Sequence, residues 1–243
     1  MRKMFYILLV VVCYACGDDN RCLKSLGDIA SLEKQSEKPF SKLYVEDRIK
    51  VTIIQDSMQA GKLVLRGPEN LLTSIGLSVS EDELRLTNNN TCNFLRSFEY
   101  SVAVDVYVNN LTRIGVESIA EVNCKDTLFV DKLEVFHNAL SDIELLLNGR
   151  EVYVQSRNSA STTLTGRIDV LKGSIEEVSD LDASNLLSGE VLLDNHSALD
   201  CKINAVKGYY LNLYNTGNIE QYGMATEYAI VNERLGSGNV VQK

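Results

Sequence analysis

The sequence contains no tryptophan and only two prolines, Pro39 and Pro68, among its 243 residues. Valine, isoleucine, leucine, tyrosine and threonine are plentiful, and small polar clusters separate the runs that contain them, a composition that favours strands and turns over helices. Hydrophobic residues make up 45% of the chain, which is enough for one or two domains with a buried core. We therefore expect an all-β protein.

Positive charge is also scarce, because 24 Lys and Arg residues face 33 Asp and Glu residues, a formal net charge of −9. The sequence has no stripe of basic residues with aromatic residues between them. An acidic excess of this kind repels phosphate backbones and anionic lipid surfaces. Nucleic acid is therefore not expected as a partner.

Long hydrophobic runs are missing except at the N-terminus, where two basic residues precede an apolar run from Met4 to Cys13. That run is too short to span a bilayer but suits the hydrophobic region of a signal peptide. The "CYAC" that ends at Cys16 resembles a bacterial lipobox, with Cys13 at the position where leucine is usual. We interpret residues 1–15 as a lipoprotein signal peptide and Cys16 as the lipidated residue, with ordinary secretion as the alternative.

An acidic cluster, "GDDN", follows Cys16. It resembles the surface-export signal of lipoproteins in one large group of Gram-negative, often gut-dwelling, bacteria, although solvated linker charge explains the two aspartates equally well. Residues 16–39 are interpreted as a polar tether between the lipid and the fold. We expect an outer-membrane lipoprotein exposed at the cell surface, and the sequence leaves the periplasmic side open.

Cysteine patterns that would bind a metal are also missing. Removal of the signal peptide and acylation of Cys16 leave four cysteines, namely Cys22, Cys92, Cys124 and Cys201. An oxidising envelope permits disulfides, but the three possible pairings are not distinguished by the sequence. Because no C-x-x-C or Cys/His zinc spacing remains among them, neither a metal nor another cofactor is expected.

What is present, from Leu111 onward, is a repeat. A small polar cluster followed by alternating apolar residues recurs at intervals of 18 to 21 residues. The first residue after each cluster is Val122, Ile143, Thr162, Leu181, Cys201, Ile219 or Val240. A period near twenty with a turn at a fixed phase is typical of a solenoid, whose coils bury their faces against each other. We expect these residues to point inward and stack.

The small residues lie where the chain bends, and Gly217, Gly236 and Gly238 are expected to adopt positive φ angles there. Before the repeats, residues 40–110 contain longer alternating segments and less regular turns. We therefore divide the folded part into an N-terminal β-rich region, residues 40–110, and a repeat β-solenoid, residues 111–243.

The corners "GSGNVV", "NTGNIE", "ALSDIEL" and "VSDLDA" resemble the G-S-G-D-V-x-L corners of the head-GIN-domain family of putative auto-transporter adhesins. The segment "FSKLYVEDRIKVTIIQDSMQAGKLVLRGPENLL" is similar to the opening strands of that family. The resemblance covers Phe40 to Lys243, although several corners lack glycine. It implies a right-handed β-helix-like solenoid, similar in outline to pectin-lyase folds, without recognised catalytic residues and with a role in adhesion.

A pectin-lyase outline raises the question of enzymatic activity. The candidate acids lie mainly at corners, where polar residues are expected in any case, namely Asp142, Asp180, Asp182 and Asp200. Cys201 is one of the residues expected to point inward and stack, and His137 and His196 lie at the entrances to corners. We therefore favour a cysteine of the core over a thiol nucleophile. We therefore expect a protein that is not an enzyme.

The most distinctive surface candidate is "GYYLNLYNTGN". Alternation directs Tyr209 and the two leucines inward and places Tyr210, Asn212 and Tyr214 outward. Exposed rings on either side of an amide are suited to a host or cell-surface protein or glycan. Two alternatives remain: the tyrosines shield neighbouring backbone, or the protein is a structural envelope module without a specific ligand. The oligomeric state is not indicated.

Replacing Cys16 with alanine is expected to abolish acylation and membrane association, because a diacyl anchor is what would hold a soluble β fold to a bilayer. Metabolic labelling with a fatty acid and fractionation of cells would measure both effects. Continued recovery of the Cys16→Ala protein in the membrane fraction would contradict the lipoprotein interpretation.

Overall fold

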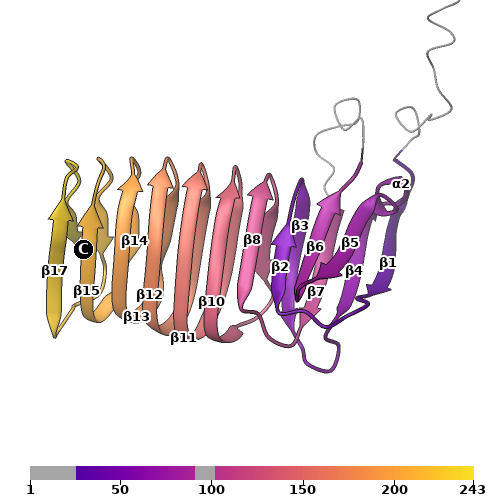
Figure 1. Ribbon diagram of the computed structural model, residues 1–243, viewed down its shortest axis with the longest axis horizontal. Helices are drawn as coiled ribbons and strands as arrows, with labels where there is room; N and C mark the ends of the chain where they lie inside the picture. The colour runs from indigo at the N-terminus through magenta and orange to yellow at the C-terminus, as the bar shows by residue number, and fades with distance from the viewer. Residues whose placement is uncertain (1–25, 91–101) are drawn as a thin grey trace, which may run out of the picture.

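The computed structural model describes residues 26–90 and 102–243, so Cys16, Cys22 and Cys92 lie outside the described residues. The described chain is 69% strand and 2% helix, and it forms a β-solenoid of about six turns with coils of about 20 residues. Figure 1 shows the coils stacked along one long axis, with β1 at one end and β17 at the other. The predicted all-β class and the solenoid are confirmed.

The elements fall into two sets. The first comprises β1 (Ile29–Gln35), β2 (Lys42–Val45), β3 (Ile49–Gln55), β4 (Lys62–Pro68), the helix α2 (Glu69–Leu72), β5 (Ile75–Ser80), β6 (Glu83–Asn88) and β7 (Val102–Val108). The second comprises β8 (Arg113–Ser118), β9 (Glu121–Cys124), β10 (Leu128–Ala139), β11 (Asp142–Asn158), β12 (Ser161–Glu177), β13 (Asp180–Ser197), β14 (Cys201–Ile203), β15 (Ala205–Leu213), β16 (Ile219–Gln221), β17 (Tyr228–Arg234) and β18 (Val240–Gln242).

The inward ladder lies in the predicted phase. Ile143 is paired in parallel with Val122 on one side and Thr162 on the other, and Thr162 is paired with Leu181. The ladder continues from Cys201 to Ile219 and Val240. All of these side chains are buried except that of Val240, which is partly exposed in the last coil. Stacking of the residue after each corner is therefore confirmed.

The solenoid begins earlier in the sequence than residue 111. Strand β2 lies between β6 and β8, and β3 lies between β7 and β9, all in parallel. Val51 thus extends the ladder, because it is paired with both Val122 and Val104. Parallel pairing consequently crosses the predicted division between residues 40–110 and 111–243, and one early coil is inserted between two later ones.

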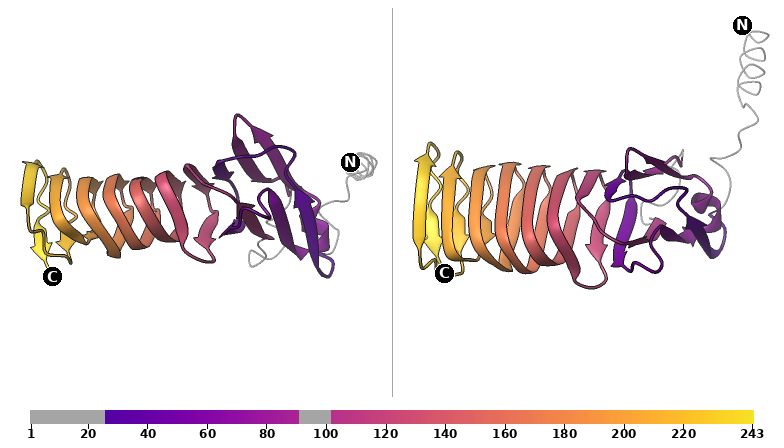
Figure 2. Two further views of the ribbon diagram at one scale, coloured as in Figure 1. Left: turned by 90° about the horizontal axis from the view of Figure 1, so that it is seen from below. Right: turned by 60° about the horizontal axis from the view of Figure 1, so that its bottom comes forward.

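Antiparallel strands close the N-terminal end of the stack. Strand β4 is antiparallel to both β1 and β7, and β5 is antiparallel to β6. Figure 2 shows these strands crossing the end of the column of coils. An end of this kind protects the first coil, as capping repeats do in other solenoids.

The prediction that residues 16–39 form a tether is wrong for Ile29–Gln35, which form β1. Strand β1 lies within that range, and its Ala30 and Leu32 pack against the core. The reason is that Ala30 and Leu32 alternate with charged and polar residues, so the mean polarity of the segment conceals a strand with one apolar face.

At the corners, glycine is required for a reason other than the predicted positive φ angle. Positive φ angles occur at the corners in Ser118, Asn158 and Glu177, which are not glycines, whereas Gly217 has none. A Cβ atom added to Gly217 would clash with the carbonyl oxygen of Leu199. Glycine is needed there because backbones of neighbouring coils approach closely, and the prediction of positive φ was wrong.

The interior contains one histidine in a closed hydrogen-bond chain. His137 was predicted at the entrance to a corner, but it points inward from β10 and is 1% exposed. Its Nδ1 lies 2.9 Å from the hydroxyl of Thr162, which lies 2.9 Å from that of Ser156. Its Nε2 lies 3.3 Å from the hydroxyl of Ser141, which donates to the carbonyl oxygen of Ala120. A neutral imidazole satisfies every partner in this chain.

Ile143→Asp is expected to lower the free energy of unfolding by several kcal/mol, because it places an unpaired carboxylate inside the stack. Glu144→Ala changes the neighbouring exposed side chain and should stay within about 0.5 kcal/mol of wild type. Urea denaturation of both variants measures the difference. Equal effects would mean that the inward phase is misassigned.

The buried histidine predicts a loss of stability in acid. Burial lowers the pKa of His137 from 6.5 to about 4. The unfolded chain therefore binds this proton more tightly, so the stabilising contribution is complete above about pH 6.5 and is lost as the pH falls toward 4. Between pH 7.5 and 4.5 the loss corresponds to about 2–3 kcal/mol.

The control is His137→Asn, which keeps a polar group beside Thr162 but does not titrate. Urea denaturation at pH 7.5 and 4.5 should show a smaller loss for His137→Asn than for wild type. The carboxylates contribute equally to both proteins, so only the difference between them reports on the histidine. Identical losses would contradict the assignment.

Candidate functional site

The predicted patch lies on the outer face of β15 near the C-terminal end. Leu211 and Leu213 are buried, whereas Tyr210 points outward between Leu192 of β13 and Ile230 of β17. Those two aliphatic side chains are 36% and 44% exposed, so the ring of Tyr210 stands in an exposed apolar row. The predicted inward and outward directions are confirmed, and the binding role remains a prediction.

The amide in this patch is already engaged. Asn212 donates from Nδ2 to the carboxylate of Asp194 at 2.7 Å. Its Oδ1 accepts from the side chain of Asn232 at 3.0 Å and from the main chain of Glu233 at 3.1 Å. Asn212 therefore joins three successive coils, and only one of its N–H groups remains for a ligand.

The second ring of the patch is held in place by its neighbours. Tyr214 stacks on His196 with ring centroids 4.1 Å apart and an interplanar angle of 10°. A hydrogen bond to Glu233 raises the pKa of Tyr214 to about 12. The phenol thus stays neutral at physiological pH, and its position is fixed before any partner binds.

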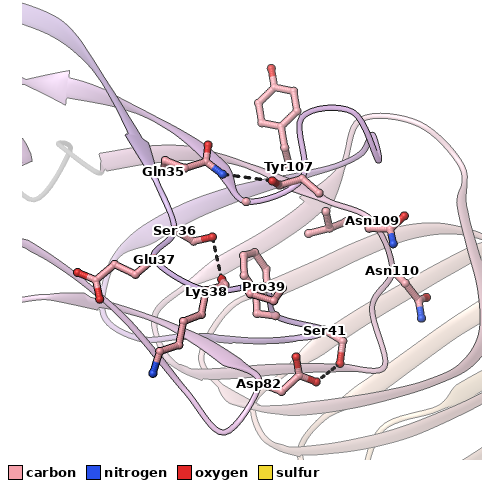
Figure 3. A pocket seen from close by; sticks show the side chains of 14 residues that line it. Gln35, Ser36, Glu37, Lys38, Pro39, Ser41, Asp82, Tyr107, Asn109 and Asn110 are labelled. Carbon is pink, nitrogen blue, oxygen red and sulfur yellow. Dashed lines mark hydrogen bonds between the residues drawn. The ribbon is translucent and has the colours of Figure 1, made fainter.

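A second candidate is a hollow of about 590 Å³ at the opposite end of the solenoid, shown in Figure 3. Four connections meet there: β1 to β2, β3 to β4, β5 to β6 and β7 to β8. The lining residues are Gln35, Ser36, Glu37, Lys38, Pro39, Phe40, Ser41, Ala60, Gly61, Asp82, Tyr107, Val108, Asn109 and Asn110. The sequence did not predict this site, because only folding brings these four connections together.

Main-chain hydrogen bonds fix the connections around the hollow. The amide of Ser36 donates to the carbonyl of Gly61 at 2.8 Å, and the amide of Gly61 donates to that of Tyr107 at 2.9 Å. On the other side, the amide of Ser41 donates to the carbonyl of Asp82 at 3.1 Å. The hollow is therefore preformed rather than dependent on loop closure.

Two cysteines lie among the described residues, and their thiols are poorly placed for nucleophilic chemistry. Cys201 is fully buried in the ladder, and burial raises its pKa to about 12. Cys124 is half-buried, its Sγ accepts from the amide of Leu146 at 3.1 Å, and burial raises its pKa as well. Both thiols are free. The interpretation of Cys201 as a core residue is confirmed.

The corner acids form hydrogen bonds between coils. Asp182 pairs with Lys202 at 2.8 Å, Asp180 accepts from Ser161 and Asp200 accepts from Asn218, in each case across one coil spacing. Residues 26–90 and 102–243 contain no group of three or more side chains suited to hold a metal ion. No helix within those residues is long and apolar enough to cross a membrane.

A family model described as "Putative auto-transporter adhesin, head GIN domain" matches residues 39–225. A putative adhesin from Bacteroides fragilis has 18% identity and a TM-score of 0.80, with 89% of this chain and 97% of that chain covered. A putative adhesin from Parabacteroides distasonis has 16% identity and a TM-score of 0.65, with coverage of 89% and 98%.

A further Parabacteroides distasonis structure, named a putative lipid binding protein, has 12% identity and a TM-score of 0.63, with 89% of this chain and 97% of that chain covered. No curated protein matches this chain. At such identities the likeness to the solved structures shows a shared fold.

Proposed function

This chain belongs to the head-GIN-domain family of putative auto-transporter adhesins, and from that premise we propose that it is a non-enzymatic adhesion lipoprotein of a Gram-negative cell envelope. In this proposal Cys16 carries the lipid, and the residues between it and β1 span the distance from the outer membrane to the solenoid. The folded part faces the cell exterior and binds a protein or glycan on a host or neighbouring cell.

The observation that carries the proposal is the position of the outer face of β15. The antiparallel strands of the N-terminal end, among them β1, lie at one end of the solenoid, and β15 and β17 lie at the other, as Figure 1 shows. A solenoid anchored through its N-terminus presents its C-terminal coils farthest from the membrane. Tyr210 and Tyr214 stand there, outward and supported by neighbouring coils.

The chemistry of this face suits recognition. The ring of Tyr210 lies in the apolar row with Leu192 and Ile230, which can cover the flat face of a sugar or an extended peptide. The rigid stack of Tyr214 on His196 loses little conformational entropy when a partner binds. The buried thiol of Cys201 and the coil-bridging acids support a role without catalysis.

Tyr210→Ala combined with Tyr214→Ala is expected to weaken binding to the partner surface by about 2–4 kcal/mol, if the two rings form a hot spot. Folding stability should change little, because Leu211 and Leu213 stay in the core. Binding of the purified protein to mucin, extracellular matrix and glycan arrays measures the effect, and thermal unfolding checks the fold.

The matched control is Tyr222→Ala, which removes a ring that is 43% exposed at the end of β16. This variant should bind as wild type does. Equal binding by the double variant and wild type would reject the patch, and no binding by wild type would favour the structural alternative. Proteolysis of intact cells must also digest the protein, because a domain confined to the periplasm cannot meet a host surface.

A further inference from the structure

Two side-chain amides at the hollow of Figure 3 are unused. Asn109 and Asn110, between β7 and β8, are exposed, and within the described chain no hydrogen-bond partner is found for either side chain. Each amide supplies two donors and one acceptor. The side chain of Asn212, by contrast, already forms three hydrogen bonds to residues of the neighbouring coils. The hollow therefore offers more free hydrogen-bonding groups than the patch on β15.

The charges around the hollow select against an anionic ligand. The carboxylate of Asp82 faces the hydroxyl of Ser41, to which it is hydrogen-bonded, on the same side as the two asparagines. Figure 3 shows the side chains of Glu37 and Lys38 directed the other way. A carboxylate accepts hydrogen bonds from hydroxyl groups but repels another anion.

An apolar surface lies between these polar groups. Pro39 is exposed and Phe40 lies beside it with its ring largely buried, so the β1–β2 connection contributes a flat hydrocarbon surface to the hollow. Binding sites for small molecules combine such surfaces with a few fixed polar groups, and they occupy roughly 300–1,000 Å³. The hollow, at about 590 Å³, falls within that range.

We propose that this hollow binds a neutral carbohydrate of one or two sugar rings. The amides of Asn109 and Asn110 donate to ring hydroxyl oxygens, Asp82 accepts from a hydroxyl group, and the C–H face of a ring covers Pro39. The site deepens the proposed function and rests on it, because it names the chemistry that an adhesin would recognise with its membrane-proximal end.

The test uses the purified full chain and neutral probes, namely methyl galactoside, methyl glucoside, N-acetylglucosamine and lactose. Saturation-transfer NMR detects contact, and calorimetry gives the affinity. Asn109→Ala with Asn110→Ala should weaken binding of the best probe at least tenfold. Asp82→Asn should weaken it several-fold, and asparagine tolerates the positive φ of 65° at that position.

The matched control is Asn148→Ala, which removes an exposed side-chain amide of β11 outside the hollow and should leave the affinity unchanged. The inference is overturned if none of the four probes binds, if galacturonate or N-acetylneuraminate binds more tightly than the neutral sugars, or if the asparagine variant binds as wild type does.

The outcomes also separate this inference from the proposed function. Tyr210→Ala with Tyr214→Ala should retain full sugar affinity, because those rings lie at the other end of the solenoid. A wild-type protein that adheres to host surfaces but ignores the probes would overturn only the sugar site. A protein that binds the probes but adheres to nothing would overturn adhesion and leave the sugar site standing.

Discussion

Parallel hydrogen bonding between successive coils is the constraint on which the rest of this structure depends. Each coil can bury its inward side chains only against the coils on either side. A one-residue shift in register would turn the ladder from Val51 to Val240 outward. Polar side chains are accommodated in the interior where neighbouring side chains form hydrogen bonds with them, as His137 and Ser156 do with the hydroxyl of Thr162.

The same constraint arranges the outer surface. Residues about twenty positions apart become neighbours, so Arg157 pairs with Glu176 and Asp182 with Lys202. Such exposed pairs contribute little stability individually, but they occupy the polar groups of the regular coils. At the N-terminal connections the regular stacking ends, and the side chains of Asn109 and Asn110 have no hydrogen-bond partner within the described residues. Side-chain amides without a partner therefore lie where the repeat is interrupted.

The two candidate surfaces lie at opposite ends of the solenoid. The patch on β15 presents aromatic rings whose positions are set by neighbouring coils. The hollow presents side-chain amides on connections that main-chain hydrogen bonds hold together. An anchor at the N-terminus would place the patch on β15 farthest from the membrane and the hollow nearer to it. This arrangement suits a protein that recognises a partner through preformed surfaces.

The sequence alone determined the all-β class, the coil length, the inward phase of the repeats and the outward direction of Tyr210, Asn212 and Tyr214. These features follow from alternation and period, which are local properties of a chain. The insertion of β2 and β3 between later strands, the pairing of β1 with β4 and the hydrogen bonds that enclose His137 were decided by tertiary structure. They depend on contacts between distant segments that leave no periodic trace.

The candidate sites divide in the same way. Alternation identified the two tyrosines, but only coil stacking revealed that Asn212 is occupied and that Tyr214 rests on His196. The hollow was not predictable, because its walls come from four irregular connections whose residues are ordinary turn residues in the sequence. The local pattern determines which way a side chain points. Packing determines its neighbours, and therefore which of its hydrogen-bonding groups remain without a partner.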